Sequence, residues 1–365
     1  MSRKLLELCL SPDLGGLELY MVRAAKALDG RFEVLSAVSP DGKLLPYFEE
    51  GGYRAETVRR RSGVLLFSAA RALARLIDDN AVDVVHMHWT KDLPVAVMAK
   101  LLSRRKPKLV QTRNMTMTRF KDDAYHRFLY RHMDMMLPVT HQVADQIRTF
   151  VPEAVRPKIE VLYMGSDKPA LLESTEIESL RREQGMEGQF VVGMVGRINE
   201  AKGQHLLIEA IAKIGNPSVH AYFVGHEMKK GYVDSLKRRA DSLGVADRVH
   251  FLGFMKNPHH FYQMCDAVVL ASRRETFGLV LIEAMQVGTA VIGSNSGGVV
   301  EIIDDGETGL LFEAGNAGML AAQISRLRDE PVFRKKVAEA GQEKAQRMFS
   351  NERQFQALGA LLEEL

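Results

Sequence analysis

Short apolar segments alternate with segments of helical periodicity along nearly the whole chain, and this pattern constrains the fold more than any other feature. A first series of strand-like segments occupies 5–10, 32–38, 82–88, 107–112, 135–139 and 158–163. A second series occupies 190–196, 219–225, 248–254, 266–272, 290–294 and 309–312. Continuous apolar strands alternating with helices are typical of parallel sheets that helices cover on both faces. We therefore predict an α/β fold with two doubly wound, Rossmann-like domains.

A polar stretch at 168–189 separates the two series and contains no strand-like segment, so we predict a linker with a short helix there. A chain of 365 residues is also long enough for two domains of similar size. The predicted domains are 1–167 and 190–348, and 349–365 is predicted to be a helix that crosses back to the first domain. We expect the two domains to face a central cleft, with hinges near 164–170 and at the start of the last helix.

Composition excludes several classes of protein. Apolar residues make up 46% of the chain and charged residues 26%, which is ordinary for a soluble globular protein. Cys9 and Cys265 lie in apolar segments and are predicted to be buried, reduced thiols without a disulfide or metal role. No segment is apolar enough over about 20 residues to cross a bilayer, and the N-terminal apolar run is too short and too charged for a secretory signal. We expect a cytoplasmic protein.

Charge is distributed unevenly between the two halves. Residues 1–165 contain 26 basic and 19 acidic side chains, against 23 and 27 in the remainder. Basic residues cluster at 58–63, 103–108 and 119–132. Each cluster by itself is typical of solvated surface, but the half as a whole favours an anionic partner: a membrane face, a nucleic acid or a phosphorylated substrate.

Ligands of such sheets bind where the strands end, and the segment GRINEAKG (196–203) follows a strand of the second domain. Arg197 and Lys202 together with the start of a helix suit a diphosphate. No strand is followed by a Walker lysine motif or by G-x-G-x-x-G, which disfavours classical nucleoside triphosphate and nicotinamide sites.

Two glutamates stand out in the segment ASRRETFGLVLIEAMQVG (271–288). Glu275 precedes a predicted helix whose first amides, those of Phe277, Gly278 and Leu279, should be unpaired donors. Glu283 lies on an apolar part of this helix, where an isolated carboxylate is costly. It either pairs with a neighbouring cation or accepts hydrogen bonds from a ligand such as a ribose diol.

The first domain offers fewer candidates. Gly15 and Gly16 lie at the first strand-to-helix turn, where backbone amides can approach a ligand, although a tight turn requires glycine as well. His86 and His88 end the strand at 82–88. We expect one imidazole to face the core and His88 to look into the cleft, where a structural and a functional role are equally favoured.

These residues resemble the retaining, nucleotide-sugar-dependent glycosyltransferases of family 4, which have the GT-B fold. The resemblance spans essentially the whole chain, and the block 265–312 is its most specific part. The motifs that carry it are GGLE (15–18), DVVHMH (83–88), GRINEAKG (196–203), FLGF (251–254) and the block CDAVVLASRRETFGLVLIEAMQVGTAVIGSNSGGVVEIIDDGETGLLF (265–312).

The resemblance implies a role for each candidate. Glu283 would bind the ribose of the donor and Glu275 the transferred sugar, while His88 would touch that sugar near the reacting carbon. The backbone around Phe254 would recognise the base. The other implied donor-binding residues are Arg197 and Lys202 on the diphosphate, Gly15 and Gly16 approaching it, and Phe277, Gly278 and Leu279 through their amides. Fixed cations would replace the divalent metal of other glycosyltransferases, so no metal or other cofactor is expected.

Some positions depart from the family pattern, and they lie on the expected acceptor side: Trp89, Arg113, Asn114 and Arg119. A cationic, aromatic acceptor pocket suits an anionic glycan or a phosphorylated, lipid-linked acceptor, although Trp89 could equally be packed under its loop. By family analogy and charge we expect a peripheral enzyme of lipopolysaccharide or other surface-polysaccharide assembly on the cytoplasmic face of the inner membrane.

Two other functions stay open at this point. A nucleotide-sugar 2-epimerase shares the fold but transfers nothing to an acceptor, and the order of residues around the two glutamates favours a transferase. A basic nucleic-acid-binding protein would use the first half, but it leaves Glu275 and Glu283 unexplained.

Overall fold

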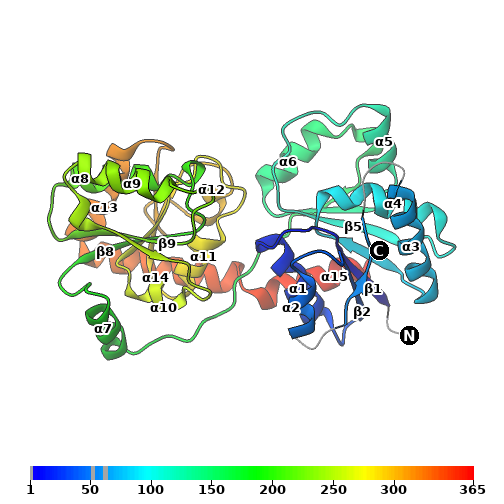
Figure 1. Cartoon of the computed structure of the whole chain (residues 1–365), viewed down its shortest axis with the longest axis horizontal. Helices are drawn as coiled ribbons and strands as arrows, with labels where there is room; N and C mark the ends of the chain where they lie inside the picture. The colour runs from blue at the N-terminus through cyan, green and yellow to red at the C-terminus, as the bar shows by residue number, and fades with distance from the viewer. Residues whose placement is uncertain (1–2, 51–53, 61–64) are drawn as a thin grey trace. The chain divides into compact units, whose positions relative to one another are not determined.

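The computed structural model describes residues 3–50, 54–60 and 65–365. The chain forms two compact units (Figure 1). The first unit comprises residues up to 163 together with Glu352–Leu365, and the second comprises Met164–Asn351. Part of the basic cluster at 58–63 lies outside the described residues. Among the helices that are described, none is long and apolar enough to cross a membrane.

The first unit is built on a parallel sheet with strand order β3-β2-β1-β4-β5-β6-β7. Its strands are β1 (Lys4–Cys9), β2 (Glu33–Val38), β3 (Glu56–Thr57), β4 (Val84–Met87), β5 (Lys108–Arg113), β6 (Met135–Pro138) and β7 (Lys158–Ile159). Its helices are α1 (Gly16–Leu28), α2 (Leu45–Glu50), α3 (Leu65–Asp79), α4 (Leu93–Leu102), α5 (Ala124–Arg131), α6 (His141–Phe150) and α15 (Asn351–Glu363), which begins at the junction of the two units.

The two faces of this sheet pack against different helices, because neighbouring residues of a strand point to opposite sides. Leu6 and Leu8 of β1 belong to a core with α3 and α4. Cys9 belongs to a second core with α1 and α2. Helix α15 packs on the α1 side, where Phe355 stacks on Tyr20 with ring centroids 5.8 Å apart.

The second unit is built on a parallel sheet with strand order β10-β9-β8-β11-β12-β13. Its strands are β8 (Phe190–Val195), β9 (Val219–Val224), β10 (Val249–Gly253), β11 (Ala267–Leu270), β12 (Ala290–Ser294) and β13 (Leu310–Phe312). Its helices are α7 (Ser174–Glu183), α8 (Gln204–Ile214), α9 (Tyr232–Ser242), α10 (His259–Met264), α11 (Leu279–Gln286), α12 (Val299–Ile302), α13 (Ala317–Asp329) and α14 (Pro331–Met348). Figure 1 shows α8 and α9 on one side of β8 and β9, and α10 on the other.

The two doubly wound sheets confirm the predicted fold class, and most strands agree with their predicted ranges within about two residues. The linker prediction is wrong in part. Helix α7 packs against α10, and Arg181 of α7 reaches Asp266 at 3.2 Å, so much of 168–189 belongs to the second unit. Strand β3 was missed because its residues, Glu56 and Thr57, are exposed and leave no apolar signal.

Both cysteines are buried and free, as predicted. Burial raises the pKa of the Cys9 thiol and of the Cys265 thiol well above their ordinary range. Neither thiol is therefore a reactive thiolate at neutral pH.

Candidate active site

The order of the strands reverses once in each sheet, between β1 and β4 in the first unit and between β8 and β11 in the second. In open α/β sheets ligands bind beyond the carboxyl ends of the strands at such a reversal. The loops after β1 and β4 carry Gly15, Gly16 and His88. The loops after β8 and β11 carry Arg197, Lys202 and Glu275. The predicted residues thus lie where each topology places a ligand.

In the second unit, the loops after β8 and β11 are joined by a salt bridge. Nζ of Lys202 lies 2.6 Å from Oε2 of Glu275, and their side chains are 25% and 17% exposed. The backbone amide of Arg273 also donates to the carbonyl of Ala201 at 3.1 Å. The sequence suggested a separate task for each of the two charges. In the structure the two side chains form one ion pair that is partly exposed to solvent.

A third loop, the one after β12, holds the backbone of Glu275. Gly298 donates its amide to the carbonyl of Glu275 at 3.1 Å. Gly297 has φ +63, and a Cβ there would lie 1.7 Å from the same carbonyl oxygen. Only glycine fits a left-handed conformation with so close a neighbour. The position of Glu275 therefore depends on Gly297 as well as on Lys202.

Arg197 and Phe254 are more exposed than the salt bridge. The Arg197 side chain is exposed and has no hydrogen-bond or ion-pair partner among the described residues, while its carbonyl accepts from Nε2 of Gln204 at 3.1 Å. Phe254 follows β10 and is 68% exposed, with its ring edge-on to His226 at a centroid separation of 5.9 Å. A free guanidinium at the end of β8 and an exposed aromatic face at the end of β10 are thus available on the same edge of the sheet, with β9 between the two strands.

Helix α11 begins at residues 277–279, whose backbone amides are predicted to be unpaired donors for a ligand. Gly278 precedes it with φ +111, and Leu279 is its first residue. The Phe277 side chain is 4% exposed and packs edge-on against Phe349. Its ring therefore belongs to the core, and only its backbone is available to a ligand. Leu281 already donates its amide to the carbonyl of Gly278 at 2.9 Å, so the amides of Leu279 and Val280 are the ones without an intrahelical acceptor. This end of the helix therefore favours an anion or a hydroxyl.

Glu283 lies on α11 between buried apolar residues and is half-buried. The hydroxyl of Tyr262, on α10, donates to its Oε2 at 2.8 Å. This hydrogen bond to Glu283 thus comes from a neutral phenol. A carboxylate offers about four lone-pair sites, and the bond from Tyr262 occupies one of them.

In the first unit, Gly15 has φ −165, which is extended backbone that any residue adopts. A Cβ at Gly16 would have nothing within 4 Å, and one at Gly15 would meet only Oε2 of Glu18 at 3.4 Å. The fold itself therefore does not require glycine at either position. Of the two explanations for these glycines, a tight turn or the approach of a ligand, this favours the second, in which glycine keeps space open at the end of β1.

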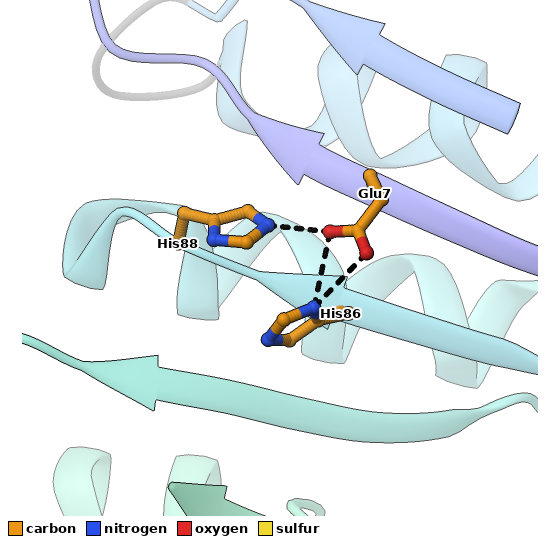
Figure 2. Close-up of side chains that lie close together, drawn as sticks. All are labelled: Glu7, His86 and His88. Atoms are coloured by element: carbon orange, nitrogen blue, oxygen red, sulfur yellow. Dashed lines mark hydrogen bonds and ion pairs between the residues drawn. The ribbon is translucent and has the colours of Figure 1, made fainter. Parts of the chain in front are cut away.

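The expectation that His86 and His88 face opposite ways is wrong. Residues two apart in a strand share a face, and both imidazoles contact Glu7 of β1 (Figure 2). Nε2 of His88 lies 2.5 Å from Oε2 of Glu7, and Nδ1 of His86 lies 3.0 Å from the same oxygen. All three side chains are essentially fully buried. In this structure His88 is part of the interior and does not offer an exposed nitrogen.

The charge state of this cluster follows from its contacts. Burial alone would raise the pKa of Glu7, but the two imidazoles outweigh it and hold that pKa at about 2. Burial and His86 lower the pKa of His88 in spite of Glu7. An ionised carboxylate only accepts, so Nε2 of His88 and Nδ1 of His86 carry the hydrogens. Nε2 of His86 lies at hydrogen-bond distance, 2.7 Å, from Oγ1 of Thr112, whereas Nδ1 of His88 has no partner among the described residues.

Glutamate and two histidines are also metal ligands, and their ligand atoms lie within 4.8 Å of one another. Tetrahedral zinc with bonds of about 2.0–2.1 Å places its ligand atoms about 3.3 Å apart. The distances of 2.5 and 3.0 Å from Oε2 of Glu7 to the two histidines are instead those of hydrogen bonds. We therefore describe Glu7, His86 and His88 as a hydrogen-bonded cluster.

The four acceptor-side residues do not form one cationic pocket. The Arg113 guanidinium is buried and donates to Oγ1 of Thr90 and to the carbonyls of Met115 and Thr116, so its role is structural. Arg119 is exposed. Asn114 has both side-chain amide atoms buried and without a partner in the described part of the chain. Because buried amides are normally hydrogen-bonded, Asn114 stays a candidate contact.

The cations that lie over the Trp89 ring are Arg60 and Lys91, and Arg113 is not one of them. Cζ of Arg60 lies 5.0 Å and Nζ of Lys91 lies 5.3 Å from the ring centroid, and the ring packs partly on the core beneath α1.

Two residues that contact the candidates were not predicted from the sequence: Glu7 in the first unit and Tyr262 in the second. Glu7 carried a signal, because it is the one charge inside the apolar segment 5–10. Tyr262 carried none, since a tyrosine in a short helix is ordinary.

Two family profiles match the chain. The profile described as glycosyl transferases group 1 matches residues 176–344. The profile described as glycosyl transferase 4-like matches residues 7–140. The two matches fall on the two sheets and include nearly all the candidate residues discussed above.

Named relatives and solved structures agree with these profiles. The lipopolysaccharide core biosynthesis glycosyltransferase LpsE of Rhizobium meliloti is 35% identical over 162 residues, which is 44% of this chain and 46% of that protein, so this match spans less than half of the relative. LpsD of the same organism, also named for lipopolysaccharide core biosynthesis, is 26% identical over 92% of this chain and 91% of its own length. The crystal structure of Anabaena HepE in complex with UDP-glucose superposes with a TM-score of 0.86 at 25% identity, covering 99% of this chain and all of that one.

Proposed function

Because the chain belongs to the family 4 glycosyltransferases of GT-B fold, we propose that it transfers a sugar, with retention of anomeric configuration and without a metal, from a nucleoside diphosphate to a glycan or lipid-linked acceptor. The observation that carries this proposal is the Lys202–Glu275 salt bridge at the strand-order reversal of the second sheet. It joins a cation suited to a leaving diphosphate with a carboxylate suited to sugar hydroxyls.

The reaction breaks the bond between C1 of the donor sugar and the diphosphate oxygen, and the electron pair leaves with the nucleoside diphosphate. Lys202 and Arg197 stabilise this growing negative charge, and the first amides of α11 add to it. Glu275 accepts hydrogen bonds from the transferred sugar, and Glu283 accepts them from the ribose. The base lies against Phe254 and its backbone.

Retention follows from attack on the face that the leaving group vacates. The acceptor hydroxyl oxygen bonds to C1, and its proton passes to an oxygen of the departing phosphate. This route needs no carboxylate placed as a nucleophile and no divalent ion, because fixed cations already face the diphosphate. Trapping of a covalent glycosyl-enzyme would overturn the proposed route.

Two observations support a donor and an acceptor class. A solved neighbour of the same fold is complexed with UDP-glucose, which makes a UDP-sugar the first donor to test. The relatives LpsE and LpsD are named for lipopolysaccharide core synthesis, which supports an acceptor of the bacterial cell surface. Trp89 with its two cations, together with Asn114, is the side-chain set of the first unit that suits an anionic glycan. An epimerase is not favoured, and it would release nucleotide without any acceptor.

The proposed contact with an anionic membrane uses residues 115–131, which we name the aromatic–basic segment. Its exposed apolar side chains are Met115, Phe120, Tyr125 and Phe128. Arg119, Lys121 and Arg131 add positive charge, while Arg127 pairs with Asp122. Aromatic side chains beside basic ones suit the interface of an anionic bilayer. The membrane that we propose for this contact is the cytoplasmic face of the inner membrane.

Co-sedimentation with vesicles tests this contact. The protein should bind phosphatidylglycerol vesicles and not phosphatidylcholine vesicles, and raised salt should release it. Replacement of both Tyr125 and Phe128 by serine should abolish binding. Val332→Ser, at a residue 84% exposed in the second unit, is the control and should bind as the wild type does. Equal binding by all three proteins would contradict the contact.

The test of the function itself is a thermal-shift panel of UDP, GDP, ADP and CMP, without added metal, followed by a transfer assay with the sugar of the nucleotide that binds. A ligand at about 100 times its dissociation constant stabilises by about 2.7 kcal/mol. One nucleoside diphosphate should raise the midpoint, and Glu283→Ala should remove the effect. No shift with any of them would overturn the proposed donor site.

A further inference from the structure

The hydrogen bond between Tyr262 and Glu283 joins a fully buried residue to a carboxylate at the candidate site. The Tyr262 side chain is 0% exposed, and its hydroxyl lies 2.8 Å from Oε2 of Glu283. Most buried tyrosines need only some acceptor for their hydroxyl. Here the acceptor is Glu283, the one carboxylate of α11, whose neighbours along the helix are apolar.

We propose that Tyr262 is a positioning residue that orients the Glu283 carboxylate for the two hydroxyls of the donor ribose. The proposal rests on the function proposed above, because it presupposes a ribose at Glu283. A glutamate side chain has three rotatable bonds, and its carboxylate accepts a diol well only when its plane is held. The short hydrogen bond from Tyr262 to one oxygen supplies such a restraint before the ligand arrives.

Two features make Tyr262 a rigid support. Oγ1 of Thr289 donates to the backbone carbonyl of Tyr262 at 2.8 Å, which ties α10 to the turn before β12. Burial, and secondarily the charge of Glu283, raises the pKa of the Tyr262 hydroxyl far above neutrality. The hydroxyl is therefore protonated and donates at neutral pH. Because Tyr262 is fully buried, it acts on the donor only through Glu283.

A purely structural tyrosine would make the same contact, so the test must separate packing from orientation. Tyr262→Phe keeps the ring and removes only the donor. Tyr222→Phe is the matched control, since Tyr222 is 2% exposed in the same unit and donates to Oε1 of Gln189 at 2.7 Å. The readout is the preference for ribose: the dissociation constant of the 2′,3′-dideoxy nucleotide divided by that of the ribonucleotide. UDP is the probe, or whichever diphosphate stabilises the wild type.

We expect the wild type to prefer the ribonucleotide by about tenfold or more, since lost hydrogen bonds to a charged group cost at least that much. Tyr262→Phe should lower this preference about three- to tenfold. It should raise the KM of the donor by the same factor at unchanged kcat, because ribose contacts do not change during reaction. Tyr222→Phe should keep the wild-type preference. In a Glu283→Ala background, Tyr262→Phe should have no further effect on it.

A wild-type preference in folded Tyr262→Phe would overturn the positioning role while leaving the proposed function intact. Absence of any nucleotide binding by the wild type would overturn both. If Tyr262→Phe does not fold, Thr289→Val releases the backbone anchor and leaves the hydroxyl in place. It should lower the same preference by a smaller factor, and an unchanged value would again overturn the role.

Discussion

The Nζ atom of Lys202 and the Oε2 atom of Glu275 lie 2.6 Å apart, although 73 residues separate them in the chain. The pair joins the loops that follow β8 and β11, the strands between which the order of the second sheet reverses. In the proposed reaction a donor at this place would meet both charges at once, with Lys202 toward the leaving diphosphate and Glu275 toward the sugar hydroxyls.

Lys202→Ala should lower kcat about 10²–10³-fold, because a positioned charge on the leaving group is lost. Its effect on stability should stay below about 1 kcal/mol, since the pair is partly exposed. Lys100→Ala is the matched control: Lys100 pairs with Asp134 at 2.6 Å with similar exposure, in the first unit. Steady-state kinetics and thermal melts check both. A kcat within threefold of the wild type for Lys202→Ala would contradict the role.

Gly297→Ala should damage both stability and activity. The new Cβ would lie 1.7 Å from the Glu275 carbonyl oxygen at φ +63, so the loop must shift. We expect a loss of about 1–3 kcal/mol in the free energy of unfolding and a lower kcat/KM through displacement of Glu275. Denaturant unfolding and kinetics measure the two effects. Unchanged values of both would show that the loop adapts freely.

Gly16→Ala should have the opposite signature. Nothing lies within 4 Å of a Cβ at this position, so the thermal midpoint should stay within about 1 °C of the wild type or rise slightly. If glycine keeps space for the diphosphate, kcat/KM should fall at least tenfold. Wild-type kinetics in a protein with the wild-type melting curve would remove Gly16 from the site.

Stability of the first unit should fall in acid through Glu7. Its pKa is about 2 in the folded chain and about 4.5 when unfolded, so its contribution is complete above pH 4.5 and is lost as the pH falls toward 2. This difference corresponds to about 3 kcal/mol. The pKa of His88 is also lowered by folding, so its contribution is present above pH 6.5 and is lost below it. Protonation of Glu7 and protonation of His88 therefore both lower the free energy of unfolding as the pH falls.

Trp89 makes this measurable, since it is the single tryptophan of the chain and lies in the first unit. Urea unfolding followed by its fluorescence at pH 7, 5, 4 and 3 should show the decline. Glu7→Gln should be less stable at pH 7, and its stability should change less between pH 4.5 and 3. The same acid slope in both proteins would show that Glu7 is not the titrating group.

Transfer should not need a divalent ion. Activity in a millimolar excess of EDTA should equal activity in magnesium or manganese, because Arg197 and Lys202 supply the charge at the diphosphate. The pair of assays should also give the same donor KM. Loss of activity in EDTA that manganese restores would contradict metal independence.

Much of the fold was predictable because its signals are local. The segment 290–294 became β12 with the same bounds, and the apolar runs of both series became strands, since alternation of apolar strands and helices encodes parallel sheets. The places of Lys202 and Glu275 were predictable too, because they follow strands. The edge strand β3 was not, since an exposed segment carries little periodic signal. The short helix at 168–189 was predicted, but its packing against α10 was not, since a polar helix gives no sign of the surface it contacts.

The contacts of the site were decided only by tertiary structure. The sequence by itself determined two doubly wound sheets, the loops that carry the candidates and the family resemblance. It did not show that His86 and His88 both contact the Glu7 carboxylate, that the Arg113 guanidinium donates to backbone carbonyls, or that the Tyr262 hydroxyl donates to Glu283. Periodicity reports how a residue faces relative to its near neighbours in the chain. A side chain's partner is set by strand order and helix packing, which bring together residues that are distant in sequence, and burial then makes their pairing obligatory.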